Sequence, residues 1–497
     1  MPEPGAPELT EAPEDARIAE HIEMVSDNTA LTTINPYSTG GGGSQAWLAY
    51  MLVHDRLLDR VHGEVGNFQP ALATSWETDD MKTFIFNLRD DVYFHNGDHF
   101  TAASVVFTVE NALNFPGTEG HTVWSRFESA RAIDDYTVEL VLHAMEIDIY
   151  YEMSLPCSGM FSEQAYRDDP ENWSFIGTGP YYVSDFDTNV LALFERFDDH
   201  WGGSAPTKSI ALRYVPEPSA RLIMLENGEI DYCMGINADD VHLFQNNPDY
   251  GIYPVNLNHL NYIGFNQDIP VLADRNFRLA VAHALNVDEI AMIAAAEWAE
   301  GVPGGTLWGR GSAYRNNSIP NRVQDLDLAK QYLEDSIYNG EEIELSCAIV
   351  TNQRAAEATQ QQLAAIGINT RIHVYDIAGI NAAASWDNNQ LEMHIFLHNA
   401  RDNAGSMRNF FYPGAQGNRT KYSDPHATDL IDRAAVELDP ARRQALYYEL
   451  QEYVYEDPPA VSIFWRINAH VGFSSVGGFT LSNDNILDFR GIFKVLD

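Results

Sequence analysis

Apolar and polar residues alternate over Thr83–Leu88, so that every second side chain is hydrophobic. A period of two predicts a strand with one buried face. The dipeptide Asn96-Gly97 comes soon after it and predicts a tight turn, because glycine adopts positive φ at little cost. Thr101 is then expected to cap a helix that runs through Val105 and Val109. The pattern therefore predicts strand, turn and helix in close succession.

Other segments carry the local chemistry of helix ends. Ser219 is expected to cap a helix that Gly228 closes in the left-handed conformation. Asp274 is expected to cap a further helix. Asn286, followed by Glu289 three residues later, approximates a capping box for the next one.

Helical and extended patterns alternate along the rest of the chain, which favours an α/β fold. Asp439-Pro440 is expected to open a last long helix, with Leu446, Leu450, Tyr453 and Val454 on one stripe. The other helices are predicted at Gln45–Leu58, Leu328–Ile337 and Ala355–Ala365. The other strands are predicted at Ile18–Thr33, Tyr181–Val183, Ile368–Val374, Met393–Leu397 and Val461–Leu481.

Composition and charge narrow the functional class. The chain has 497 residues, more than one hydrophobic core normally organises, so two or three domains are expected. Its formal net charge is −42, and such a surface repels nucleic acid and anionic lipid. We interpret this charge mainly as an acidic, highly soluble surface.

Cysteines and apolar runs place further limits. Cys157, Cys233 and Cys347 are too few for a disulfide scaffold and too far apart for a metal site, although one bridge between two of them is open. No run approaches the roughly 20 apolar residues of a membrane span. Residues 1–20 are acidic and proline-rich, so we expect a flexible tether and a mature, exported form, the alternative being a cytoplasmic protein that begins here.

No catalytic constellation is apparent, so no enzyme activity and no cofactor are predicted. His95 and His99 have i,i+4 spacing, but Asn96-Gly97 breaks any helix between them, which argues against zinc. His394 and His398 lie in a predicted strand and are expected to be packed or to face a cleft. No G-x-S-x-G motif supports serine hydrolysis.

Three blocks resemble the signature of one family. The first block, Pro70–Val106, includes the pattern L-R-x-x-V-x-F-H-x-G. The second block begins at Ile176 with GTGPYYV and ends with EPSARLIMLENGEIDY. The third block is Tyr262–Ile290, YIGFNQDIPVLADRNFRLAVAHALNVDEI. In order and spacing the blocks resemble family 5 extracytoplasmic solute-binding proteins, the dipeptide, oligopeptide and nickel receptors of bacterial ABC importers.

The resemblance implies a two-lobed, α/β periplasmic-binding-protein-like fold of class II, of the large subtype with an extra subdomain. It implies hinge closure around a ligand held in a cleft between the lobes. The expected divisions are a tether at 1–20, the main part of lobe I at 21–45, 171–261 and 466–497, its extra subdomain at 46–170, and lobe II at 262–465.

The resemblance also suggests ligand-binding residues. An aspartate that pairs with a peptide's α-amino group in relatives aligns with Asn403 here, next to Asp402, and Arg401 departs from the family pattern. Arg354 matches the region where some dipeptide receptors hold the peptide's carboxylate, which suits a guanidinium fork.

Further candidates come from a ligand-facing loop and from aromatic side chains. Tyr37 and Ser38 precede a run of four glycines that no Lys-Ser/Thr pair follows, which argues against a phosphate loop. Trp308, Trp386 and Tyr412, together with Tyr37, are candidate aromatic walls.

The favoured hypothesis is a monomeric, extracytoplasmic receptor that binds a small solute, first of all a short peptide, and delivers it to an ABC permease and ATPase complex. Attachment to the membrane is expected only through a lipid anchor. The alternatives are an oligosaccharide, a nickel complex, an opine or another organic acid as ligand, or a hydrolase of peptides or glycosides.

Overall fold

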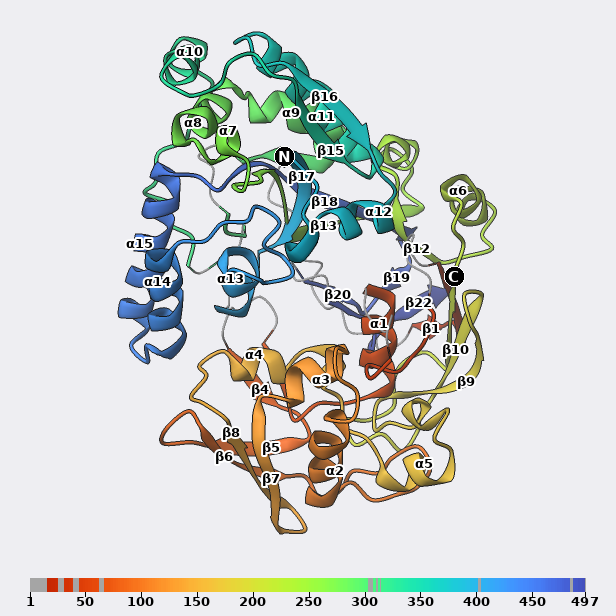
Figure 1. The fold of residues 1–497 in the computed structure, drawn as a ribbon. Coiled ribbons are helices and arrows are strands. Elements are labelled where there is room, and N and C mark those ends of the chain that lie inside the picture. The colour runs from red at the N-terminus through yellow and green to blue at the C-terminus, as the bar shows by residue number, and fades with distance from the viewer. Residues whose placement is uncertain are drawn as a thin grey trace. The chain divides into compact units, whose positions relative to one another are not determined.

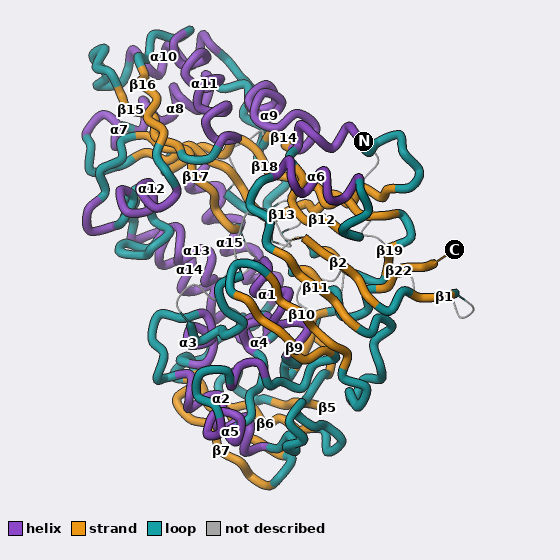
Figure 2. The backbone as a smooth tube through the Cα atoms, turned by 90° about the vertical axis from the view of Figure 1, so that its right-hand side faces the viewer, coloured by secondary structure: helices purple, strands orange, loops and turns teal. Residues whose placement is uncertain are grey.

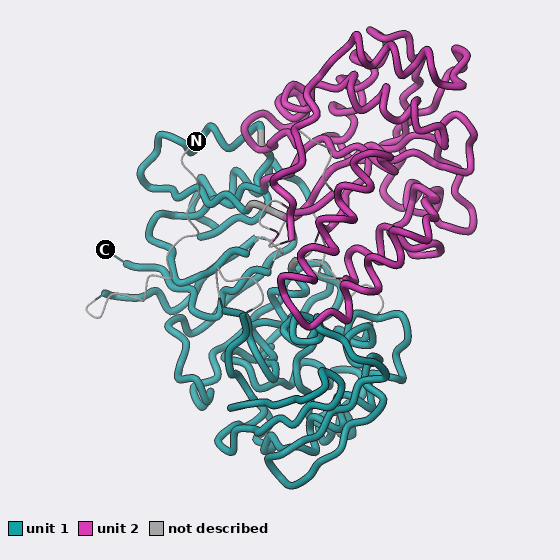
Figure 3. Tube along the Cα trace, turned by 90° about the vertical axis from the view of Figure 1, so that its left-hand side faces the viewer, with its two compact units in different colours: residues 1–255, 468–497 teal, residues 256–467 magenta. Residues whose placement is uncertain are grey.

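In the computed structural model the chain forms two compact units, called unit 1 (residues 1–255 and 468–497) and unit 2 (residues 256–467) (Figure 3). The structure describes residues 16–25, 31–38, 44–61, 67–302, 307–309, 312, 314–400, 404–482 and 486–496. Two long strands, β13 (Tyr250–Phe265) and β18 (Ala460–Phe473), carry the chain from one unit to the other. The predicted lobe II, 262–465, falls inside unit 2.

Unit 1 contains a mixed sheet with strand order β12–β2–β11–β10–β9, and the end of β18 pairs with β12 (Figure 2). Strand β2 pairs in parallel with both β11 and β12, whereas β10 runs antiparallel to its two neighbours. The strands are β2 (His21–Val25), β9 (Tyr181–Asp187), β10 (Leu191–Arg196), β11 (Ser209–Arg213) and β12 (Tyr232–Ile236).

A second sheet of unit 1 has the order β5–β6–β8–β7, with helix α2 (Ala102–Ala112) packed on β7 (Figure 1). Its strands are β5 (Ala73–Glu77), β6 (Thr83–Leu88), β7 (Phe127–Asp134) and β8 (Thr137–Leu142). The alternating segment is therefore confirmed as a strand. Thr101 is confirmed as the N-cap of α2, and its backbone N–H donates to Ser104 Oγ at 3.3 Å.

Short elements complete unit 1. The helices are α1 (Ser44–Val53), α3 (Glu119–Trp124), α4 (Ile149–Met153), α5 (Glu163–Asp168) and α6 (Pro218–Glu226), and the strands are β1 (Arg17–Ile18), β3 (Leu58–Arg60), β4 (Phe68–Pro70), β19 (Val476–Gly477), β20 (Thr480–Leu481), β21 (Leu487–Asp488) and β22 (Phe493–Leu496). Strand β1 pairs with β22, so residues 17 and 18 belong to a sheet although the tether was predicted to extend to residue 20.

Unit 2 is built on strands in the order β16–β15–β17–β13, with β14 (Ala299–Gly301) paired to β18. Strands β15 (Ile343–Cys347), β16 (Thr370–Val374) and β17 (Met393–Asn399) run parallel, and β13 is antiparallel to β17. The helices are α7 (Pro270–Ala273), α8 (Arg275–Ala284), α9 (Val287–Ala295), α10 (Leu326–Glu334), α11 (Val350–Ala364), α12 (Ile377–Ala383), α13 (Ala404–Phe411), α14 (Pro425–Val436) and α15 (Pro440–Glu456).

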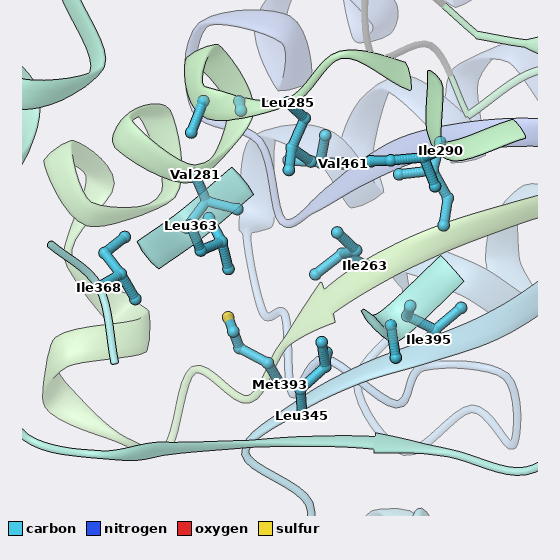
Figure 4. Close-up of a cluster of buried hydrophobic side chains, with 14 of the residues drawn as sticks. Ile263, Val281, Leu285, Ile290, Leu345, Leu363, Ile368, Met393, Ile395 and Val461 are labelled. Carbon is cyan, nitrogen blue, oxygen red and sulfur yellow. The ribbon is translucent and has the colours of Figure 1, made fainter. Parts of the chain in front are cut away.

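Two apolar clusters hold unit 2 together. Side chains of α8, α9 and α11 form one of them with the strands, and Figure 4 shows Leu363 and Ile290 among strand residues such as Ile263 and Met393. The other cluster combines α12–α15 with Leu260, Tyr262 and Phe396 of the same strands. Helices thus cover the sheet with two separate cores, as in other α/β folds.

The predicted helix caps of unit 2 are mostly correct. The Asp274 carboxylate accepts bonds from the backbone of the first turn of α8, and Asp439 does the same for α15. The side chain of Asn286 accepts from the Glu289 N–H at 3.2 Å, as predicted. The return bond differs, because the Asn286 N–H donates to Gln362 Oε1 on α11 at 2.8 Å. A neighbouring helix therefore replaces the local half of the capping box.

Other local predictions were displaced by their surroundings. The N-cap of α6 is Glu217 and not Ser219, because Pro218 occupies the first helical position, where its missing N–H is tolerated. Gly228 has φ 71°, as predicted. On α15 the stripe is buried except for Tyr453, whose hydroxyl donates to Asp424. Cys157, Cys233 and Cys347 are all buried and are not joined in a disulfide, and burial raises the pKa of Cys347 to about 11.

The first and second blocks of the sequence contact each other through His95. Its Nδ1 accepts a hydrogen bond from the Gly177 N–H at 3.2 Å, so Nε2 carries the proton and donates to the Gly179 carbonyl at 2.9 Å. Gly97, in the turn next to it, has φ 88°. The turn predicted from Asn96-Gly97 thereby fixes the position of the Gly-Thr-Gly-Pro loop.

The same loop ends helix α1. The Gly179 N–H donates to the Val53 carbonyl at 2.9 Å. A Cβ added at Gly179 would lie 2.5 Å from the Leu52 carbonyl oxygen, and one added at Gly177 would overlap the Val53 carbonyl oxygen. Helix α1 therefore stops at Val53 instead of continuing to Leu58 as predicted, and both glycines are needed for the approach.

We expect Gly177→Ala to lower the free energy of unfolding by more than about 2 kcal/mol, because backbone atoms on both sides must move to admit the methyl group. Gly340→Ala is the control, since Gly340 has φ 84° but open space around it, and it is expected to cost about 1 kcal/mol. Urea unfolding of both variants measures the difference, and equal losses would contradict the close-approach argument.

Two buried histidines are expected to make the stability of the protein depend on pH. Burial lowers the pKa of His54 to about 3 and that of His95 to about 4, so both are neutral in the folded protein. An unfolded histidine titrates near pH 6.5. As the pH falls from about 6.5 toward 4, the unfolded chain takes up protons that the folded chain does not, and each histidine reduces stability by on the order of 1–2 kcal/mol at pH 5.

The melting temperature is therefore expected to fall between pH 7.5 and pH 5, and to fall less in His95→Gln. His242→Gln changes an exposed histidine and serves as the control substitution. An unchanged slope in His95→Gln would contradict this assignment.

Candidate functional site

The parallel strands of unit 2 bring three loops to one edge of the sheet. Strands β15, β16 and β17 end at Cys347, Val374 and Asn399, and each is followed by the start of a helix, α11, α12 or α13. Parallel strands end on the same side, and ligands of open α/β sheets bind at the carboxyl ends of the strands. We call the residues at these three strand-to-helix connections the carboxyl edge of unit 2.

Arg354 lies at this edge, in the second turn of α11, and is half-buried. Two residues earlier, the buried Asn352 donates from Nδ2 to the Ile395 carbonyl of β17 at 3.4 Å, which ties the start of α11 to the sheet. The helix start adds the partial positive charge of its unpaired N–H groups. Together these features favour an anionic group near the beginning of α11.

The remaining residues predicted near this edge fall on the β17–α13 connection. Arg401, Asp402 and Asn403 lie outside the described residues. On either side of them, the Ala400 N–H donates to the Asn258 carbonyl at 2.9 Å, and Ser406 Oγ donates to the Asn399 carbonyl at 2.7 Å. Their proposed contact with an amine stays a prediction.

Trp386 lies at the other end of β17. It precedes that strand in a 3-10 turn, and Lys421 donates to its carbonyl and lies 4.6 Å from its ring. Lys421 also pairs with Asp268 at 3.4 Å, just beyond Phe265, which pairs with Met393 at the start of β17. These contacts place Trp386 beside the start of β17, and its contact with a ligand stays a prediction.

The other aromatic candidates are packed within their own units. Tyr412 follows α13, is half-buried and donates to the Thr428 carbonyl at 3.4 Å. Trp308 is 2% exposed and its ring lies 6.2 Å from that of Phe411. These contacts hold both rings within unit 2, and a ligand contact by either ring stays a prediction.

Tyr37 is 3% exposed and stacks on Trp173 with the ring centroids 5.6 Å apart. Phe115 and Phe161 also contact its ring. The adjacent Ser38 is half-buried, and its N–H donates to the Asn35 carbonyl at 3.1 Å. The loop after β2 is therefore anchored by an aromatic cluster of unit 1, and its role toward a ligand stays a prediction.

Unit 1 has a carboxyl edge of its own, where β2, β11 and β12 end. The buried Arg221 of α6 donates to the Val215 carbonyl at 2.9 Å, after β11, and to the Gly235 carbonyl at 3.2 Å, in β12. This arginine is the last residue of Glu-Pro-Ser-Ala-Arg in the second block. Its role in the fold is to hold two strand ends together.

The two histidines of β17 are packed and not exposed to solvent. His394 is 0% and His398 is 5% exposed, and burial lowers the pKa of each to about 3. Arg419, whose guanidinium lies 4.1 Å from the Phe396 ring centroid, adds to this lowering. The sequence did not reveal the effect of Arg419 on these two histidines, because an arginine outside any motif does not show which buried side chains it will lie beside.

Nowhere in the described ranges do three or more His, Cys, Asp or Glu side chains gather so that a metal ion could be held. Among the described helices none has by itself the length and apolar content to cross a membrane, although α8 and the segment Val287–Trp298, bent by 64°, meet both criteria as a pair.

Known proteins share this sequence and fold. Residues 67–422 match the family described as bacterial extracellular solute-binding proteins, family 5 Middle. The glutathione-binding protein GsiB of Pectobacterium atrosepticum is 24% identical over 443 residues, which cover 84% of each chain.

Two solved structures resemble this chain over most of its length. A putative peptide-binding protein, AppA, from Clostridium difficile has a TM-score of 0.85 at 22% identity, covering 96% of this chain and 100% of that one. The periplasmic binding protein DppA from Helicobacter pylori, in complex with the peptide STSA, has a TM-score of 0.80 at 22% identity, covering 97% and 99%. The likeness confirms the predicted fold class. With the family match spanning most of the sequence, the chain belongs to the family 5 bacterial extracellular solute-binding proteins.

Proposed function

We propose that this protein is the receptor of an ABC importer, and that it binds a short peptide whose terminal carboxylate is held by Arg354. The observation that carries the proposal is the position of Arg354 at the carboxyl edge of unit 2, at the start of α11. The relative with a bound peptide and the glutathione-binding relative support a peptidic ligand.

The chemistry needed is recognition without bond formation. A guanidinium can donate two parallel N–H bonds to the two oxygens of a carboxylate, and the first turn of α11 adds favourable potential for the same charge. Asp402 or Asn403 would accept bonds from the peptide's amino group. Binding would then shift the protein toward the conformation with the higher affinity for the peptide, and the permease would recognise that conformation.

The location follows from the family. Members are extracellular solute-binding proteins, so the protein works on the outer side of the cell membrane. We infer that its partners are a permease and an ATPase complex, that it acts as a monomer, and that a lipid anchor attaches it to the membrane. Capture between two lobes, expected from the resemblance, remains part of this proposal.

Native mass spectrometry of the protein as purified is expected to reveal a bound short peptide with a free carboxylate. Incubation with a peptide pool is expected to raise the melting temperature without consuming any peptide. A hydrolase would instead release cleaved peptide in molar excess over the protein. An oligosaccharide, a nickel complex or an opine in the spectrum would contradict the peptide assignment while leaving the receptor role in place.

Arg354→Ala is expected to weaken binding of Ala-Ala-Leu about tenfold or more, because hydrogen bonds to a charged group contribute roughly 1.5–3 kcal/mol. The C-terminal amide of this peptide should bind the variant and the parent protein equally. Arg371→Ala removes an exposed arginine that pairs with Glu342 and Glu344 and serves as the control. Calorimetry measures the affinity of the parent protein and of the two variants for each peptide. Unchanged affinity in both Arg354→Ala and Asp402→Ala would remove the model of a peptide held at both ends.

A further inference from the structure

Three aliphatic side chains are exposed at the carboxyl edge of unit 2. Val350, the first residue of α11, is 65% exposed, and Ile377, the first residue of α12, is 62% exposed. Val374, the last residue of β16, is 46% exposed. We call these three residues the apolar rim.

The register of the sheet places the rim along one edge. Cys347 pairs with Val374 in the parallel β15–β16 ladder, and the Tyr375 N–H continues the ladder by donating to the Cys347 carbonyl at 2.8 Å. Val350 and Ile377 each follow this pair by three residues, on neighbouring connections. Figure 2 shows β15 and β16 side by side along their length. The rim residues therefore belong to adjacent loops and are not scattered over the surface.

The charge of these loops differs from that of the whole chain. Residues 348–354 and 375–379 contain one carboxylate, Asp376, and one guanidinium, Arg354, whereas the formal net charge of the protein is −42. The Asp376 side chain accepts a hydrogen bond from the Gly379 N–H at 2.6 Å and caps α12. These two connections are thus close to neutral on an otherwise acidic protein.

Single exposed aliphatic residues are common on protein surfaces, but a group of them beside a polar anchor is typical of a binding surface. An apolar rim that adjoins the Arg354 guanidinium complements a ligand with a carboxylate and an aliphatic group close together. The last residue of a peptide ending in leucine, isoleucine or valine has this chemistry. A peptide ending in glutamate or lysine would place a second charge against apolar atoms.

We propose that the apolar rim receives the aliphatic side chain of the peptide's last residue while Arg354 holds its carboxylate. This inference rests on the proposed function and adds the class of peptide to it. The gain comes from removing apolar surface of both partners from water, at about 25 cal/mol per Å².

Calorimetric titration with Ala-Ala-Leu, Ala-Ala-Glu and Ala-Ala-Lys tests the proposal, since the three peptides share their amino end and differ only in the last side chain. Ala-Ala-Leu is expected to bind about tenfold more tightly than the other two. If the net charge of the protein set the preference, Ala-Ala-Lys would bind most tightly, and that result would overturn the inference.

Val350→Ser and Ile377→Ser are each expected to reduce the advantage of Ala-Ala-Leu about threefold or more and to leave the affinity for Ala-Ala-Glu unchanged. Val323→Ser is the matched control, because Val323 is 68% exposed and lies outside the three connections. An unchanged preference in both rim variants would overturn the inference and leave the proposed function standing. If none of the three peptides binds, the inference fails together with the proposed function.

Discussion

Parallel pairing of strands is the constraint on which the functional parts of this protein depend. In unit 1, β2 lies between β11 and β12, and in unit 2, β15 lies between β16 and β17, with all three strands of each set parallel. A parallel strand must be followed by a crossover, so each of these strands ends in a loop that leads away from the sheet. Within each unit these loops leave the sheet on one side, and residues far apart in sequence, such as Arg354 and Ile377, thereby follow neighbouring strands.

Buried arginine side chains stabilise the ends of strands and helices in this chain, in which cationic residues are few. Arg221 binds carbonyl groups at two strand ends of unit 1. In unit 2, the buried Arg278 donates to the Leu272 carbonyl at 2.9 Å and pairs with Asp457 after α15. Each arginine donates to backbone carbonyl groups in the interior, where an unpaired carbonyl costs free energy. The excess of acidic over basic residues is therefore compatible with an interior in which arginines bond to backbone carbonyl groups.

Local chemistry made the strand β6 and the caps at Thr101 and Asp274 predictable, because each depends on a few neighbouring residues. Tertiary contacts decided the rest. Helix α1 stops early since the Gly177–Gly179 loop binds its end, and Gln362 replaces a bond expected from Glu289. For the site, Arg354 was suggested by resemblance and its contact with a ligand stays a prediction. An aromatic residue such as Trp386 carries no information in sequence about which end of a strand it occupies. The exposure of Val350 and Ile377 likewise follows only from the fold.

The distribution of the three thiols gives the molecule an internal reporter of local opening. Cys157 and Cys233 are in unit 1, whereas Cys347 is the single cysteine of unit 2, at the end of β15. With its pKa raised by burial, the Cys347 thiol is protected from alkylation as long as its surroundings stay closed. Its rate of modification by a thiol reagent would therefore follow the transient unfolding of unit 2 separately from that of unit 1.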